Sequence, residues 1–191
     1  MRITCTRLIS FAVPFASLLA FPTKASALGP VYVEIGAMAG TATGTLGPLG
    51  FGIGGRGGAS IAGLYAGVEV IDYLGATSTC GGCSMPAGVA PVQQRRGGLL
   101  YGIEGGYNFK FSPMTIRPQL GLGNFALWSA YGAPTGPGVV SNYFYIEPGV
   151  AWLVSFGMVF VGVDAAALVL ATRGGGGGLA VTAHGQIGVS F

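Results

Sequence analysis

Residues 179–191 alternate between apolar and polar or small side chains up to the last position of the sequence. One face carries Leu179, Val181, Ala183, Gly185, Ile187, Val189 and Phe191. The opposite face carries Ala180, Thr182, His184, Gln186, Gly188 and Ser190. Because successive side chains of a β-strand point to opposite faces, this segment predicts a strand with one apolar and one polar wall. A soluble sandwich turns the polar wall to water, whereas a transmembrane barrel turns the apolar wall to lipid and the polar wall to its lumen.

The composition favours the membrane. Charged residues make up 8% of the chain and the mean hydropathy is +0.64, whereas an ordinary soluble domain is about 25% charged. Beyond residue 27, no uninterrupted apolar run of the roughly 18 residues needed for a transmembrane helix occurs. Since only helices and closed barrels satisfy their backbone hydrogen bonds in lipid, the sequence predicts a transmembrane β-barrel. The competing prediction, a secreted β-sandwich, leaves the low charge unexplained.

The first 27 residues have the pattern of a secretory signal peptide. Arg2 and Arg7 are basic, residues 8–21 form a short apolar run, and residues 25–27 offer small side chains for cleavage. We therefore expect a signal peptide over 1–27 and a mature chain over 28–191. The alternative, an uncleaved anchor helix, is disfavoured because the apolar run is short and interrupted by Pro14.

Removal of this leader also removes the positive net charge. The formal charge of +3 depends on Arg2, Arg7 and Lys24, and residues 28–191 carry equal numbers of basic and acidic side chains. Nucleic-acid binding requires a basic stripe that neutralises phosphates. The balanced charge therefore predicts no nucleic-acid partner.

The spacing of the alternating segments predicts the topology. Eight such segments cover residues 31–42, 51–61, 64–75, 96–110, 115–129, 141–154, 158–171 and 179–191. The short spacers are 62–63, 111–114 and 155–157, and the longer ones are 43–50, 76–95, 130–140 and 172–178. Short periplasmic turns that alternate with long external loops are typical of outer-membrane barrels. We therefore predict an all-β fold, an eight-stranded antiparallel up-and-down transmembrane β-barrel, with both ends of the chain on the periplasmic side.

The alternation also assigns a direction to each charged side chain. Every acidic residue except Asp72 falls on a face that we assign to the lumen, so we expect a β-bulge or the membrane boundary at Asp72. The predicted luminal network comprises Glu34, Arg56, Glu69, Glu104, Lys110, Arg117, Glu147, Asp164 and His184. The turn at 62–63 should place Arg56 opposite Glu69. The turn at 111–114 should place Asn108 opposite Arg117. Buried charges are tolerated only when paired, so we interpret the network as structural; a gated proton or small-ion path is the alternative.

The sequence shows no pattern for catalysis. His184 is the only histidine and has no adjacent serine, whereas nucleophilic catalysis needs a serine hydrogen-bonded to its base. A single histidine without neighbouring ligands also makes no metal site. We therefore expect no enzyme, no cofactor and no metal; a membrane-embedded lipid A-modifying enzyme is the least favoured alternative.

The leader, the alternation of strands and spacers and the terminal aromatic residue together resemble the outer-membrane protein β-barrel family, of the OmpA/OmpX-like eight-stranded kind. The resemblance covers residues 31–191. It implies a Gram-negative outer-membrane location and Phe191 as a C-terminal assembly signal. It also implies barrel assembly machinery and periplasmic chaperones as partners, with outer-membrane lipid and lipopolysaccharide around the barrel. With no peptidoglycan-binding domain after the last strand, the expected role is structural or surface interaction through external loops, and a narrow porin-like channel is the alternative. The sequence names no extracellular ligand.

Cys80 and Cys83 lie in the longest spacer. In the cytosol this spacing would suggest redox chemistry or half of a zinc site. In an exported chain without a second cysteine pair, it favours a structural disulfide.

We predict that Cys80 and Cys83 form an intramolecular disulfide that contributes little to barrel stability, because the closed loop is short. Alkylation of protein prepared from an oxidising periplasm should label neither thiol until a reductant is added. Labelling without reductant would contradict the disulfide.

Overall fold

The computed structural model describes residues 30–45, 47–79, 93–131, 139–171 and 178–191. These ranges form strands β1 (Val31–Gly44), β2 (Gly50–Ile61), β3 (Leu64–Thr79), β4 (Gln93–Tyr107), β5 (Phe109–Phe111), β6 (Met114–Tyr131), β7 (Val139–Phe156), β8 (Val159–Ala171) and β9 (Gly178–Ser190). Across these ranges, no helix is long and apolar enough to cross a membrane. The expected leader and the two cysteines of the predicted disulfide lie outside the described residues.

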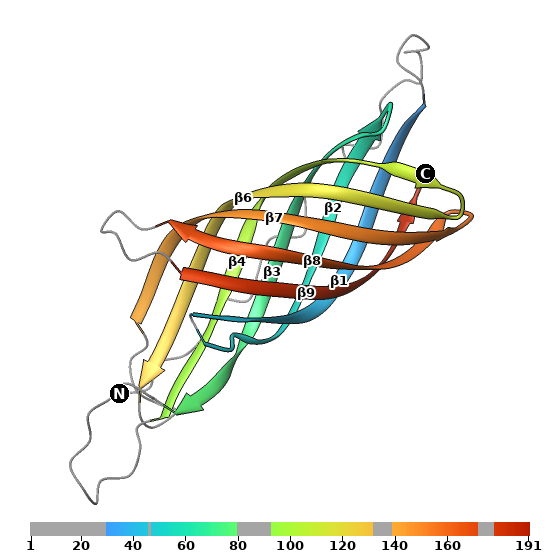
Figure 1. Ribbon diagram of the computed structural model, residues 1–191. Helices are drawn as coiled ribbons and strands as arrows, with labels where there is room; N and C mark the ends of the chain where they lie inside the picture. The colour runs from blue at the N-terminus through green and yellow to red at the C-terminus, as the bar shows by residue number, and fades with distance from the viewer. Residues whose placement is uncertain (1–29, 46, 80–92, 132–138, 172–177) are drawn as a thin grey trace, which may run out of the picture.

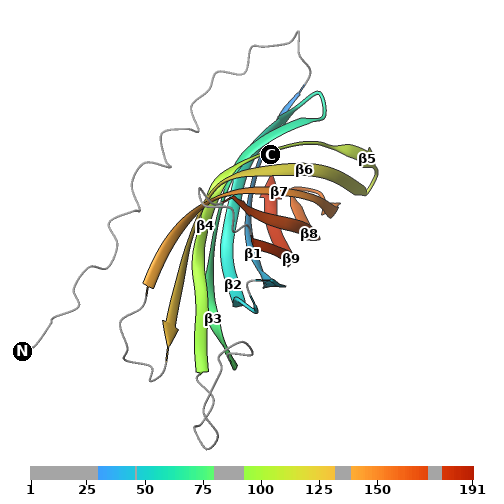
Figure 2. The same cartoon turned by 60° about the vertical axis from the view of Figure 1, so that its left-hand side comes forward.

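All strands belong to one antiparallel sheet that closes on itself (Figures 1 and 2). The strand order runs β4-β3-β2-β1-β9-β8-β7-β6-β5, and pairing between β4 and β6 completes the ring. β5 continues the line of β4 beyond Asn108, since both pair with β6 in one register. The fold is therefore the predicted closed eight-stranded up-and-down barrel.

The strands are staggered as they go round the barrel. Residue pairs followed from Tyr32 through the successive strands return to β1 at Ala42 instead of at Tyr32. This offset tilts the strands relative to the barrel axis and fixes the barrel diameter. With eight strands, the interior is just wide enough for side chains to fill it.

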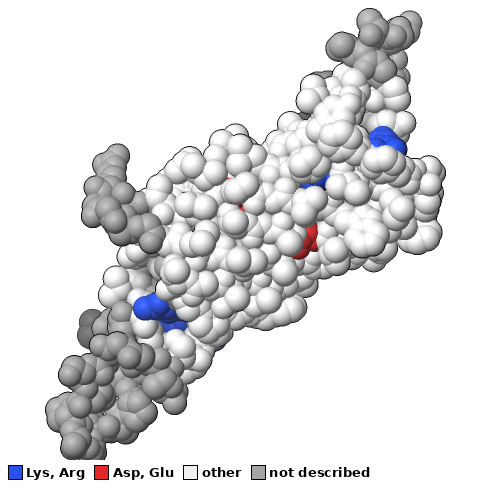
Figure 3. Space-filling model, in the orientation of Figure 1, with Lys and Arg blue, Asp and Glu red and all other residues white. Residues whose placement is uncertain are grey.

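The two faces of the sheet have the polarity of a transmembrane barrel. Large apolar side chains stand exposed on the outer face, for example Leu64 at 62% and Ile103 at 61% exposure. Ionisable side chains such as Arg56, Glu104 and Asp164 are buried inside. The face seen in Figure 3 shows few charged side chains over the barrel wall. Water would not stabilise this apolar exterior, whereas lipid does.

Two strands, β3 and β4, extend further into the spacer between them than the sequence indicated. β3 reaches Thr79 and β4 begins at Gln93, so the spacer predicted at 76–95 is partly strand. The expected irregularity is a register shift between Tyr73 and Ala76, where Gly75 has a φ of 92°. Because the shift follows Asp72, that carboxylate stays exposed on the outer face, opposite Ile53 and Leu99.

Pro148 lies on the outer face of β7. Its ring is exposed opposite Leu120. The pairing of β7 with β8 is interrupted between Ile146 and Gly149, because proline has no N–H to donate to the ladder.

The three short turns gather at one end of the barrel, at the right of Figure 1. They join β2 to β3, β5 to β6 and β7 to β8. The strand ends at Thr79 and Gln93 lie at the opposite end.

We expect an epitope inserted after Pro86 to be labelled by antibody on intact cells. Pro86 lies between β3 and β4 in the sequence, and these strands end opposite the short turns, at the end that we assign to the cell surface. The matched control is the same epitope inserted between Ala62 and Gly63, which should be labelled only after lysis. The reverse pattern would show that the barrel has the opposite orientation.

Candidate functional site: the barrel lumen

Arg56 occupies the centre of the lumen and faces three carboxylates. Its guanidinium lies 3.8 Å from Glu69, 3.3 Å from Glu104 and 3.4 Å from Asp164. All four side chains are at most 5% exposed. We call Arg56, Glu69, Glu104 and Asp164 the central charge cluster. It joins β2, β3, β4 and β8 across the narrow interior.

A two-residue turn at Ala62 and Gly63 determines the pairing of Arg56 with Glu69. Ala62 and Gly63 both have positive φ, at 51° and 87°, as tight hairpin turns between antiparallel strands require. The turn makes Arg56 and Glu69 direct cross-strand partners. This is the pairing that the sequence indicated. Pairing of Arg56 with Glu104 and Asp164 comes instead from barrel closure, which the sequence alone did not specify.

Tyrosine hydroxyl groups satisfy two of the carboxylates. Tyr65 donates a hydrogen bond to Glu104 at 2.6 Å, and Tyr145 donates one to Glu69 at 3.0 Å. Charge-assisted hydrogen bonds of this kind stabilise a buried carboxylate more than neutral ones do. The luminal network predicted from the sequence did not include these tyrosines.

His184 connects the central charge cluster to a third tyrosine. Its Nδ1 lies 2.9 Å from Asp164 Oδ1, and its Nε2 lies 2.9 Å from the Tyr73 hydroxyl. The Tyr73 ring is fully buried and meets Phe125 edge to face at a centroid distance of 6.2 Å. Both ring nitrogens of His184 therefore have partners, and neither partner is a serine.

Glu147 sits apart from the arginines. It accepts a hydrogen bond from Thr182 at 2.8 Å through Oε1, while its Oε2 is buried with no hydrogen-bond partner among the described residues. The side chain is luminal, as predicted, but no cation pairs with it in the described part of the barrel.

A second charged group lies nearer the short turns. Arg117 on β6 pairs with Glu34 and donates from Nε to Asn108 Oδ1 at 2.6 Å. Its guanidinium also stacks 3.7 Å from the centre of the Tyr65 ring. Asn108 and Arg117 are thus neighbours, as the turn at 111–114 required. The ion pair with Glu34 on β1 is a contact that the strand frames did not identify.

Lys110 faces the lumen but stands outside the expected ion-pair network. Its Nζ lies 4.0 Å from the centre of the Tyr32 ring, and no described carboxylate is within ion-pair distance. Lys110 forms no ion pair because it lies on β5, near the end of the barrel, where its side chain remains exposed.

The other half of the lumen is largely apolar, although Gln94 is also buried there. The strand frames alone did not indicate this. A continuous buried cluster, here called the apolar plug, consists of Met38, Ala42, Leu49, Ile71, Tyr73, Leu100, Phe125, Leu127, Tyr145, Leu168, Leu170 and Ala180. Most of these positions are in phase with the luminal charges, as Ile71 is with Glu69 and Leu168 with Asp164. Their position on the same strand faces as the luminal charges was the sequence signal that could have identified them as luminal.

The described side chains offer no metal site. Nowhere in the described ranges do three His, Cys, Asp or Glu side chains approach in a way that would hold a metal ion. The acidic groups of the central charge cluster instead surround a guanidinium. The arrangement is therefore suited to cross-linking strands by ion pairs.

We predict that Arg56→Met destabilises the barrel by about 3 to 5 kcal/mol, because three carboxylates lose their buried counter-charge. Glu69→Met should cost less, since two acidic partners of Arg56 remain. The double variant should cost less than the sum of the two single changes, because the residues are in contact. Denaturant unfolding in lipid vesicles would measure these effects.

The matched control is Arg95→Met, which removes an arginine from the exposed rim and should cost less than about 1 kcal/mol. Strict additivity of Arg56→Met and Glu69→Met would show that the two side chains do not interact.

Comparison with known proteins places the fold. No protein-family model and no curated protein matches the chain. The N-terminal β-barrel domain of Pseudomonas aeruginosa OprF is similar in structure, with 13% identity, coverage of 84% of this chain and 97% of that chain, and a TM-score of 0.54. Neisserial surface protein A gives 15% identity, 84% and 97% coverage and a TM-score of 0.51. A major outer membrane protein from Thermus thermophilus gives 13% identity, 85% and 100% coverage and a TM-score of 0.59.

These identities carry information about the fold and not about ligands. The matched structures are covered almost completely, so the likeness includes the whole barrel. With its closed sheet, apolar exterior and buried charges, the chain has the fold of the small eight-stranded outer-membrane β-barrels.

Proposed function

We propose that this small outer-membrane β-barrel has a closed lumen and serves a structural or surface-interaction role through its external connections. The observation that carries the proposal is the apolar plug. Its members include Phe125, Leu100 and Leu168, which have no exposed surface. A conducting path needs a continuous polar lining, and these side chains interrupt it across the half of the lumen away from the short turns.

The central charge cluster supports a structural role. Arg56 links carboxylates from three other strands, and Arg117 links β6 to Glu34 on β1. Ion pairs buried in this way become costly if either partner is lost. They therefore favour one arrangement of the strands over alternatives in which a charge would be left unpaired.

The narrow channel remains the second candidate, because the half of the lumen nearer the short turns is polar. An ion entering there would meet the Arg117–Glu34 pair and then the central charge cluster. For the channel to conduct, side chains of the apolar plug would have to move out of the path.

A lipid A-modifying enzyme is the third candidate and has less support. The group formed by Asp164, His184 and Tyr73 is enclosed by the barrel wall, with each side chain at most 5% exposed. A lipid in the surrounding membrane has no access to it.

Export and assembly belong to the same proposal. We infer cleavage of residues 1–27 and recognition of Phe191 by barrel assembly machinery, with delivery by periplasmic chaperones. Phe191 extends the pairing of β9 with β1, since its N–H donates to Val33 at 3.0 Å and its carbonyl accepts from Val33 at 2.8 Å. Its ring lies on the apolar outer side and is 45% exposed, which is accessible to a partner surface.

Conductance in planar bilayers tests the closed lumen. We expect the wild-type barrel to show no stable current steps, because the apolar plug excludes water and ions. The variant Leu100→Ala/Phe125→Ala, which shortens two plug side chains, should give steps or increased leak. The matched control, Leu64→Ala/Ile103→Ala, makes the same kind of change on the lipid-facing wall and should stay silent. Stable steps from the wild-type protein would favour the channel.

A further inference from the structure

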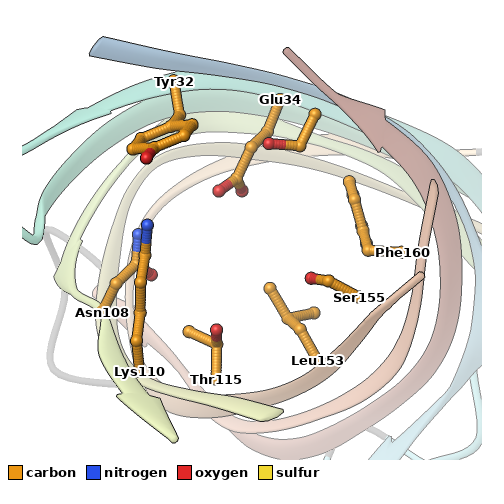
Figure 4. A pocket seen from close by; sticks show the side chains of 9 residues that line it. Tyr32, Glu34, Asn108, Lys110, Thr115, Leu153, Ser155 and Phe160 are labelled. Carbon is orange, nitrogen blue, oxygen red and sulfur yellow. The ribbon is translucent and has the colours of Figure 1, made fainter. Parts of the chain in front are cut away.

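A small polar pocket opens at the short-turn end of the lumen, beside Glu34 (Figure 4). Its volume is about 50 Å³. Figure 4 shows the side chains of Glu34, Thr115 and Ser155 pointing into the same space, with Lys110 along one wall. We call this space the mouth pocket. Neither the structural role of the central charge cluster nor the apolar plug uses it.

Two buried donors at this end of the lumen have no acceptor among the described residues, one on Asn108, which lines the mouth pocket, and one on Arg117, which lies behind it. Arg117 has only donors, so the Asn108 amide turns its oxygen toward Arg117 and its nitrogen away. That nitrogen, Nδ2, is buried without a partner in the described structure, and Asn108 is 5% exposed. Nη1 of Arg117 is likewise buried without a partner among the described residues. Since buried donors are nearly always satisfied, these two require an explanation.

The charges around the mouth pocket sum to a positive value. Glu34 is neutralised by its ion pair with Arg117, and Lys110 has no carboxylate partner among the described residues. Lys110 contacts the face of the Tyr32 ring, at 4.0 Å. Thr115, the cross-strand partner of Lys110, and Ser155 on β7 add hydroxyl groups that can donate. The pocket therefore combines an ammonium group, an amide donor and two hydroxyl groups.

We propose that the mouth pocket binds a small oxyanion, a carboxylate or phosphate group, that enters from the short-turn side. The ammonium of Lys110 and the amide of Asn108 hold the anion, and the hydroxyl groups of Thr115 and Ser155 orient it. A space of about 50 Å³ exceeds the roughly 10 to 15 Å³ that one water requires, so a group of a few heavy atoms fits. Charge-assisted donors of this type are the usual ligands of carboxylates and phosphates.

Phosphorus-31 NMR relaxation of inorganic phosphate tests the proposal, with the full chain folded in maltoside micelles at constant ionic strength. We expect phosphate to bind to the wild type, and acetate to compete if the site accepts carboxylates as well. Acetate without effect would assign the site to phosphate alone. Methylammonium, a cation of similar size, should not bind; its binding in place of phosphate would overturn the proposal.

Variants of the lining residues test whether phosphate binds in the mouth pocket itself. Lys110→Gln should weaken phosphate binding by about tenfold, as expected for one charge-assisted contact. Glu34→Gln should strengthen it by about threefold, because a negative charge leaves the pocket. The matched control Arg95→Gln removes the same charge at the opposite rim and should change the affinity by less than about twofold.

Folding of each variant is checked by its heat-modifiable mobility on a gel. If Lys110→Gln does not fold, Thr115→Val tests the same pocket, with an expected loss of about threefold from one neutral hydrogen bond. Equal binding of phosphate by the wild type and these variants would show that the mouth pocket is not an oxyanion site. Loss of phosphate binding in Glu34→Gln would show the same.

Discussion

Lipid offers no hydrogen-bonding partner to a peptide group, and this constraint governs the rest of the structure. A sheet can satisfy its backbone in the bilayer only by closing, and here closure is made by pairing of β4 with β6 and of β1 with β9. With eight strands the resulting lumen is narrow. Every side chain of the inner face must therefore contact others from across the barrel, so that residues far apart in the chain become partners.

The buried ions follow from that narrowness. Arg56 could not remain inside without counter-charge, and the lumen brings Glu104 and Asp164 within 3.4 Å of it from strands that are not its neighbours. The tyrosines of the same layer then satisfy oxygens that the guanidinium does not reach. The central charge cluster is thus as much a product of barrel geometry as of the charges themselves.

Strand period and turn length made most of the fold predictable. The alternation in 179–191 and the turn at 62–63 determined the faces and the Arg56–Glu69 register, and both are present in the structure. The apolar plug was not predictable in the same way. The alternation of side chains predicts that Ile71 and Leu100 face the lumen, but it does not predict which residues they contact there. The position of Lys110 outside the ion pairs was missed for a related reason: height along the barrel depends on the stagger of all strands together.

The lumen consequently has two halves of opposite character. Toward the short turns it is polar and charged, with donors of Asn108 and Lys110 still available; toward the long connections it is filled with side chains such as Phe125 and Leu170. Tyr73 joins the two halves, because its hydroxyl contacts His184 while its ring packs on Phe125. A charge moving inward from the turns would have to leave the ion pairs and enter an apolar environment, where desolvation opposes it strongly. In the proposed closed barrel, the barrier to conduction therefore lies at the boundary marked by Tyr73, and any opening would have to act there.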